Sequence, residues 1–305
     1  MLLNIQSALL MTGDHVHQME PKRKAMPMKF FKYHALGNDY VVLDPADVGN
    51  ELTSHQIRSI CHRNYGIGSD GILFGPFLSP QGDFVLRIFN PDGSEAEKSG
   101  NGLRMFSRYL WDKGLVQETP FIIMTAGGKV ISHVHKGGKN VTVEMGRVSF
   151  DSRKIPVEGS PREVLNERII VNGQDLLFCA ATIGNPHCVI LRDEISAEET
   201  QKWGPLIEKD PRFPNRTNVQ FMKICDRKTI KIEIWERGAG YTLASGSSSS
   251  AAAAVAYKLG LCDSQIAVNM PGGTIEITVS NDFSISMVGP VVKVAEGTIV
   301  DDMFA

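Results

Sequence analysis

Two short segments of this chain carry the same residue types at the same spacing. A Ser-Gly pair stands at positions 99–100 and again at 245–246, and a polar residue, Asn90 or Glu236, precedes each serine by nine positions. Each pair opens a helical pattern. The first N–H groups of a helix have no partner within the helix and carry partial positive charge, and glycine lets this backbone approach a ligand closely. The segments therefore predict two anion-binding loops, with N-capping by serine alone as the simpler alternative.

A carboxylate is the expected anion, because no Walker-type lysine follows either loop and no GxGxxG motif fits. Two matching loops can hold one small molecule from opposite sides, which is the geometry that a racemase or epimerase needs. The adjacent Glu236 and Arg237 would then bind a ligand ammonium and a ligand carboxylate. The alternative is a salt bridge between these two side chains.

The duplication extends beyond the two loops. Four pairs of segments match in the same order at a nearly constant offset: 34–43 and 181–190, 88–102 and 234–248, 124–130 and 269–275, and 143–146 and 286–289. This pattern indicates an internal duplication. Asn38 and Asn185 stand at equivalent Gly-Asn positions, so we expect them to bind polar groups of a ligand. Asparagine beside a turn is also often merely structural.

Hydrophobic periodicity predicts the elements that position these loops. Helices are expected over 56–63, 102–113 and 249–259, and strands over 41–43, 141–145, 189–191 and 275–279. Within the second helix, Leu103, Phe106, Tyr109 and Leu110 form one apolar stripe. Because tight turns join the strands, we predict an α+β fold of two pseudo-symmetric halves. Each half is a mixed or antiparallel sheet around a central helix.

The chain divides into an extension and two halves. Residues 1–27 lack the basic start of a signal peptide and do not fit the strand pattern that begins at Met28, so we expect a disordered extension. The first half is predicted over 28–150, with 292–305 as a candidate strand that returns to it. The second half is predicted over 151–291.

Composition excludes several partners. A formal net charge of -2 leaves no basic field for nucleic acid, and the alanine run 251–256 is too short to span a membrane. Five cysteines without CxxC spacing predict reduced, buried thiols in a cytoplasmic protein. The His-Val-His pairs at 15–17 and 133–135 lack a third ligand, so no metal is expected. His187 is open to a structural or a catalytic role.

Six motifs from residue 28 onward resemble those of the diaminopimelate epimerase family, in the same order and at the same spacing. They are His34-Ala-Leu-Gly-Asn-Asp-Tyr, Asn90-Pro-Asp-Gly-Ser-Glu-Ala, Ser99-Gly-Asn-Gly-Leu-Arg, Gly184-Asn-Pro-His-Cys-Val, Thr217-Asn-Val and Glu236-Arg-Gly-Ala-Gly. The resemblance implies two barrel-like halves with the site in the cleft between them. It also implies conversion of LL- to meso-diaminopimelate in lysine biosynthesis by two-base proton transfer, without pyridoxal phosphate, other cofactors or a metal.

The resemblance carries the site over residue by residue. The catalytic positions are Ser99 and Ser245. The implied substrate-binding residues are Asn38, Asn90, Gly100, Asn101, Asn185, Asn218, Glu236, Arg237, Gly246 and Ser247. The partner implied is therefore a small amino acid, and a homodimer is the default assembly.

The chain departs from the family at the two catalytic positions, where the family has cysteine and this chain has Ser99 and Ser245. Tyr241 and the serines at 248–250 depart from the family as well. A thiol has a pKa of about 8.5, whereas a serine hydroxyl needs an adjacent base to act. Three explanations stay open: an engineered replacement that traps substrate, a natural enzyme with altered chemistry, or a silent relative that binds an amino acid or serves as a partner subunit.

Overall fold

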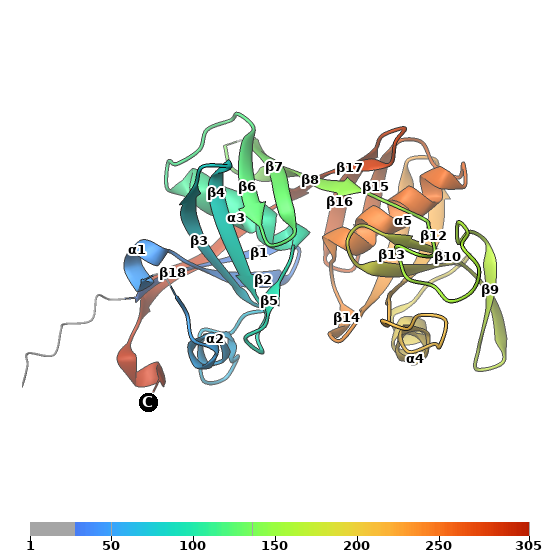
Figure 1. Cartoon of the computed structure of the whole chain (residues 1–305), viewed down its shortest axis with the longest axis horizontal. Coiled ribbons are helices and arrows are strands. Elements are labelled where there is room, and N and C mark those ends of the chain that lie inside the picture. Colours follow the sequence, from blue (N-terminus) through green and yellow to red (C-terminus); the bar gives the residue numbers. More distant parts are fainter. Residues whose placement is uncertain (1–27, 50, 136, 305) are drawn as a thin grey trace, which may run out of the picture.

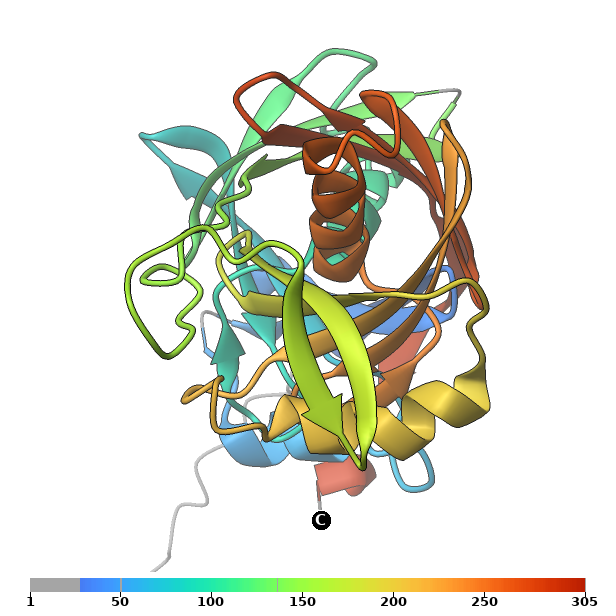
Figure 2. The same cartoon turned by 90° about the vertical axis from the view of Figure 1, so that its right-hand side faces the viewer.

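Two barrel-like halves stand side by side in this computed structural model, which describes residues 28–49, 51–135 and 137–304 (Figure 1). The predicted extension 1–27, with the histidine pair at 15–17, lies outside the described residues. Each half wraps a sheet around one central helix, and the view in Figure 2 looks along the inside of one barrel onto its helix. The predicted α+β fold of two pseudo-symmetric halves is confirmed.

The first half surrounds helix α3 (Gly100–Asp112) with eight strands. They are β1 (Met28–Ala35), β2 (Asn38–Leu43), β3 (Ile72–Ser79), β4 (Gly82–Phe89), β5 (Glu95–Ala96), β6 (Phe121–Thr125), β7 (Gly128–His135) and β8 (Asn140–Arg147). Two short helices, α1 (Pro45–Val48) and α2 (Ser54–Cys61), connect β2 to β3 outside the barrel.

The second half repeats this order around α5 (Gly246–Lys258). Its strands are β9 (Glu167–Val171), β10 (Gln174–Thr182), β11 (Pro186–Leu191), β12 (Asn218–Asp226), β13 (Thr229–Glu236), β14 (Gly240–Thr242), β15 (Gln265–Met270), β16 (Gly273–Val279) and β17 (Ser284–Pro290). Helix α4 (Ala197–Glu208) takes the place of α2, on the same side of the molecule (Figure 1).

The strand pairing has the same pattern in both halves. β2 pairs parallel with β3, as β11 does with β12, and β4 pairs parallel with β6, as β13 does with β15. The intervening hairpins β3–β4 and β12–β13 are antiparallel. The mixed sheet therefore follows from the duplicated sequence, with one crossover connection for each parallel pair.

Two further pairings complete the sheet. β8 pairs antiparallel with β17 and joins the halves, and the last strand, β18 (Val292–Ile299), returns to the first half and pairs antiparallel with β1. A short 3-10 helix, η1 (Asp301–Phe304), follows β18 and packs against α2. The chain thus ends on its first half, the direction expected for residues 292–305, while the domain boundaries themselves stay a prediction.

The two central helices are buried by different means. The predicted stripe on α3 is fully buried, and its four large side chains fill the first barrel. On α5 the run Ala251–Ala256 is buried on every side, so this barrel closes tightly around a thin helix. Both helices begin earlier than predicted, α3 by two residues and α5 by three, because the Ser-Gly pairs cap them.

The five cysteines form no disulfide. Four of them are buried as predicted, but the prediction of burial was wrong for Cys225, which is exposed near the end of β12. That end of the strand runs into a hairpin turn at the surface. Among the described helices, none has the length and apolar character needed to cross a membrane.

Candidate functional site

Each Ser-Gly pair forms the N-cap of its helix. Ser99 Oγ accepts a hydrogen bond from the backbone N–H of Gly102 at 3.1 Å, and Ser245 Oγ accepts one from Ser248 N–H at 3.5 Å. The simpler alternative, capping by serine, is therefore present at both loops. Capping still leaves N–H groups that can bind an anion, because a helix start has four unpaired N–H groups and each serine satisfies only one of them.

The two helix starts lie against each other at the junction of the halves. A Cβ added to Gly246 would lie 3.5 Å from the Cα of Gly100, and Asn101 Nδ2 donates to the carbonyl of Ala244 at 3.4 Å. A Cβ added to Gly100 would lie 2.9 Å from Cε of Met287. Glycine at 100 and 246 is what lets two positively polarised helix ends come this close.

Each capping serine has a different titratable neighbour. Glu236, at the end of β13, interacts with Ser245, and burial raises the pKa of its carboxyl above the ordinary value while the Ser245 hydrogen bond opposes that rise. Tyr40, in β2, interacts with Ser99, and burial raises the pKa of its phenol to about 12. A carboxyl group therefore stands beside one serine and a neutral phenol beside the other.

The predicted asparagines gather around the same two helix starts. Asn38 Oδ1 accepts from Asn101 Nδ2 at 3.0 Å beside α3, and Asn185 Nδ2 donates to Ser247 Oγ at 3.4 Å beside α5. Asn218 accepts from the backbone N–H of Arg237 at 2.9 Å. Asn38 and Asn185 thus keep equivalent places in the two halves, as the repeat predicted.

Asn90 and Arg237 lie at the rim of this cluster. Asn90 Nδ2 donates to Ser94 Oγ at 2.9 Å, which is a bond within its own loop. Its equivalent in the other half, Glu236, instead contacts the capping serine, Ser245. The exposed Arg237 donates to the carbonyl of Asn215 at 2.9 Å. Among the described residues, Arg237 has no ion pair with Glu236, so the salt-bridge alternative for these two side chains was wrong.

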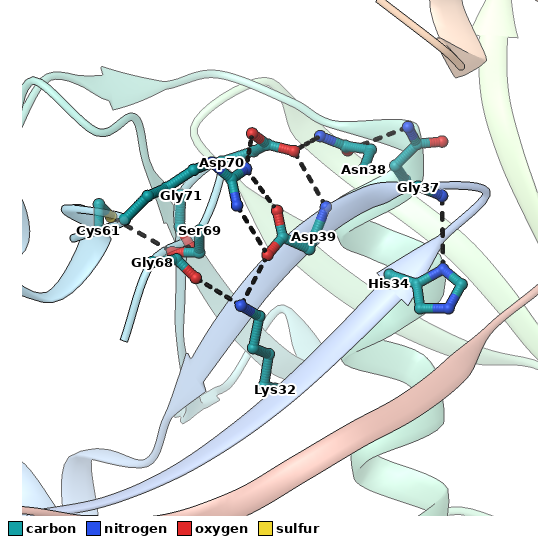
Figure 3. A network of polar contacts seen from close by, with 12 residues as sticks. Lys32, His34, Gly37, Asn38, Asp39, Cys61, Gly68, Ser69, Asp70 and Gly71 are labelled. Carbon is teal, nitrogen blue, oxygen red and sulfur yellow. Dashed lines mark hydrogen bonds and ion pairs between the residues drawn. The ribbon is translucent and has the colours of Figure 1, made fainter. Parts of the chain in front are cut away.

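Asp70 and Arg104 were not anticipated from the sequence. Asp70 Oδ2 accepts from Asn38 Nδ2 at 2.9 Å and from Asp39 N–H at 3.1 Å (Figure 3). Arg104 Nη2 donates to Asn101 Oδ1 at 2.8 Å. The duplication gave no signal for Asp70, because the register of β2–β3 against β11–β12 places Thr217 at its equivalent position.

His187 is fully buried in β11, with Nε2 3.0 Å from Asn185 Oδ1. Burial lowers the pKa of this imidazole to about 3, so it is neutral at physiological pH.

At the histidine pair His133–His135, His135 Nε2 lies 2.7 Å from Thr142 Oγ1. In the described part of the chain, no group of three or more His, Cys, Asp or Glu side chains is arranged to hold a metal.

Comparison with known proteins adds the family. A family model described as diaminopimelate epimerase matches residues 30–150 and 179–294. The chain belongs to the diaminopimelate epimerase family. One relative in this family, diaminopimelate epimerase 2 of Nostoc sp., is 65% identical over 278 residues, which cover 91% of this chain and 98% of the relative. The diaminopimelate epimerase of Desulfitobacterium hafniense is 37% identical, over 90% and 99% of the two chains.

Solved structures show the same fold at low identity. A probable proline racemase from Agrobacterium radiobacter with bound carbonate has a TM-score of 0.65 at 15% identity, over 90% of this chain and 93% of that one. A phenazine biosynthesis protein of the PhzF family from Bacillus anthracis has a TM-score of 0.63 at 16% identity, over 90% and 99%. Members of the diaminopimelate epimerase family therefore share this duplicated architecture with other proteins.

Proposed function

We propose that this chain is a cofactor-independent epimerase that binds diaminopimelate where the starts of α3 and α5 meet and inverts an α-carbon there. The observation that carries the proposal is the close approach of the two helix starts, 3.5 Å between a Cβ at Gly246 and the Cα of Gly100. Two positively polarised backbone segments meet at one point and suit an α-carboxylate. The names of the relatives supply the substrate class.

In the proposed reaction, Ser245 and Glu236 act together on one face of the α-carbon. Ser245 Oγ takes the α-proton as it passes its own proton to the Glu236 carboxylate. The electron pair of the broken C–H bond stays on the substrate and spreads into its carboxylate. The backbone N–H groups at Gly100 and Gly246 stabilise the charge that develops there.

Ser99 acts on the opposite face. Its hydroxyl donates a proton to the α-carbon, and the new C–H bond completes the inversion. The resulting alkoxide recovers a proton from Tyr40, with which Ser99 interacts. Asn38, Asn101, Asn185, Asn218 and Ser247 are proposed to bind the polar groups of the substrate, and Asn90 and Arg237 to close the rim. Homodimerisation and a cytoplasmic location stay predictions from the sequence.

A second candidate function is amino-acid binding without turnover. It is favoured by the asymmetry of the two serines, because only Ser245 has a carboxylate beside it, while the neighbour of Ser99 is a phenol with a pKa of about 12. A serine that lacks a base is a poor proton acceptor. In that case Ser99 takes no part in proton transfer, the two-base reaction stops in both directions, and the site only binds the amino acid.

One experiment separates the two functions. The protein is incubated with LL- and meso-diaminopimelate in heavy water, α-proton exchange is followed by NMR, and binding is measured by calorimetry. Exchange supports the epimerase, and binding without exchange supports the silent relative. Absence of both contradicts the proposed site.

Restoring the thiols sharpens this result. The double variant Ser99→Cys with Ser245→Cys is expected to raise the exchange rate, because a thiolate forms far more readily near neutral pH than an alkoxide. The matched control is Ser196→Cys, which changes the N-cap serine of α4, whose Oγ accepts from Glu199 N–H at 3.1 Å. The control is expected to leave exchange unchanged.

A further inference from the structure

Arg104 is a fully buried guanidinium in the second turn of α3, directly behind the proposed site. Its Nη2 donates to Asn101 Oδ1 at 2.8 Å, and its Nη1 lies 3.3 Å from the sulfur of Met287. Its Nε has no hydrogen-bond partner. Gly289 lines its pocket, since a Cβ there would lie 2.7 Å from Nη1.

No carboxylate within the described residues pairs with Arg104, although a fully buried guanidinium in a protein is normally paired. Burial alone lowers the pKa of this guanidinium to about 10, so it keeps its charge. Its strongest hydrogen bond goes to a neutral amide. An unpaired buried guanidinium does not stabilise the fold, so we look for its role in the neighbouring site.

The bond from Arg104 begins a chain of hydrogen bonds that all run in one direction. Arg104 donates to Asn101 Oδ1, Asn101 Nδ2 donates to Asn38 Oδ1 at 3.0 Å, and Asn38 Nδ2 donates to Asp70 Oδ2 at 2.9 Å. Figure 3 shows the Asp70 end, where the Asn38 side-chain amide and the Asp39 backbone N–H both donate to the Asp70 carboxylate. Arg63 holds the other oxygen of Asp70 at 2.6 Å.

The two ends of this chain fix its direction. A guanidinium can only donate hydrogen bonds, and an ionised carboxylate can only accept them. Neither asparagine can therefore turn its amide over without placing two donors or two acceptors face to face. Without the two ends, the side-chain amides of Asn38 and Asn101 could adopt either orientation, because the oxygen and the NH2 of an amide occupy nearly the same space.

We propose that Arg104 and Asp70 are positioning residues that together fix the amide directions of Asn38 and Asn101, so that diaminopimelate meets one pattern of donors and acceptors beside α3. This inference rests on the proposed function for the role of the two asparagines in binding. The chain itself is a property of the free protein. It serves the α3 side, and the α5 side has Thr217 in place of a carboxylate.

The test is a double-mutant cycle with Arg104→Met and Asp70→Asn, read by calorimetric affinity for diaminopimelate and by the urea midpoint of unfolding without ligand. Each single variant is expected to bind about tenfold more weakly, which corresponds to about 1.4 kcal/mol. The double variant is expected to lose affinity for diaminopimelate by a factor nearer ten than a hundred. Once one end is lost the amides can reverse, so loss of the second end adds little.

A control cycle pairs Arg104→Met with Asp83→Asn. The Asp83 carboxylate accepts from Ile122 N–H at 2.7 Å, outside the chain of amides, so these two effects are expected to add. If Arg104→Met does not fold, Gly289→Ala replaces it, because its Cβ displaces the guanidinium while the charge stays. Arg104→Lys, which keeps the charge and one donor, is expected to recover part of the affinity.

The two readouts distinguish failure of this inference from failure of the proposed function. Coupling in both the midpoint and the affinity supports the positioning role. Coupling in the midpoint alone, with no binding by the unmodified protein, leaves the chain of amides intact and overturns its role in binding. Additive effects in the midpoint, or full affinity in Arg104→Met, overturn the inference whatever the protein binds.

Discussion

The α3 side and the α5 side of the site share one backbone and differ in their chemistry. Both have a serine N-cap, a glycine at the first helical position and an asparagine from the preceding Gly-Asn turn. On the α5 side the serine contacts the carboxyl of Glu236. On the α3 side it contacts the phenol of Tyr40, and the carboxylate, Asp70, lies behind the asparagine.

The comparison shows that the duplicated backbone places the two helix starts, while single side chains decide the chemistry on each side. The matched strand pairings bring the two helix starts together. Whether a loop can remove a proton then depends on one side chain beside the serine. Asn90 and Glu236 occupy equivalent positions, yet only Glu236 is a potential base.

The largest effect is expected from removing that base. Glu236→Gln keeps the size of the side chain and should lower α-proton exchange by about a hundredfold or more, the usual contribution of a general base. Asn90→Ala, its counterpart in the other half, should change exchange far less, because Asn90 bonds Ser94 instead of Ser99. NMR exchange rates in heavy water measure both, and equal losses would show that the two sides are not chemically distinct.

The same substitution should stabilise the protein. Burial raises the pKa of Glu236 in the folded state, so the folded protein binds this proton more tightly than the unfolded chain does. Stability from this group is present below the unfolded pKa of about 4.3 and is lost as pH rises through the higher folded value. Glu236→Gln should therefore raise the urea midpoint at pH 7 and leave it little changed in acid. A midpoint that falls at pH 7 contradicts the raised pKa.

Asp39 on the α3 side should show the opposite dependence. Its carboxylate is desolvated, but it bonds Lys32 at 2.9 Å (Figure 3). It also bonds Arg63 at 2.8 Å, and the two cations together hold its pKa below the ordinary value. The stability that it contributes is present above the unfolded pKa of about 3.9 and is lost as pH falls through the lower folded value. Asp39→Asn should cost about 2 kcal/mol at pH 7, as expected for lost bonds to charged groups.

A matched control for Asp39 is Asp47→Asn. Asp47 pairs with the exposed Lys29 at 3.4 Å, and an exposed pair contributes less than about 1 kcal/mol. Urea unfolding at pH 7 and at pH 3 measures both variants. The cost of Asp39→Asn should shrink in acid, and a cost that is the same at both pH values would exclude the lowered pKa as its cause.

The sequence predicted the architecture well because duplication and periodicity report on backbone and burial. The stripe from Leu103 to Leu110 and the run Ala251–Ala256 gave both central helices, and the repeated Gly-Asn turns gave equivalent asparagines. The helix starts were placed too late, since Gly246 and the serines after it have weak helix propensity and gain their order from the Ser245 cap.

The sequence did not predict the contacts that distinguish the two sides. Asp70 reaches Asn38 across a parallel strand pair, and Arg104 reaches Asn101 within a helix otherwise noted for its apolar stripe. Such bonds depend on side-chain direction in the folded state, which neither periodicity nor the repeat encodes. The alternative of a Glu236–Arg237 salt bridge was wrong for the same reason, because Arg237 lies in the turn after β13 and donates to the carbonyl of Asn215 instead.

The smallest expected effect is the difference in stability lost when the N-cap serine of α3 or of α5 is replaced by alanine. Ser99 Oγ accepts from Gly102 N–H at 3.1 Å, whereas the bond from Ser248 N–H to Ser245 Oγ is 3.5 Å long. Replacing an N-cap serine by alanine costs about 1 kcal/mol, and a longer bond contributes less. Ser99→Ala should therefore lower the free energy of unfolding more than Ser245→Ala does, by several tenths of a kcal/mol, in urea titrations at pH 7. The reverse order would mean that the contact with Glu236, and not the cap, dominates the contribution of Ser245 to stability, so that the α5 side would have exchanged helix capping for chemistry.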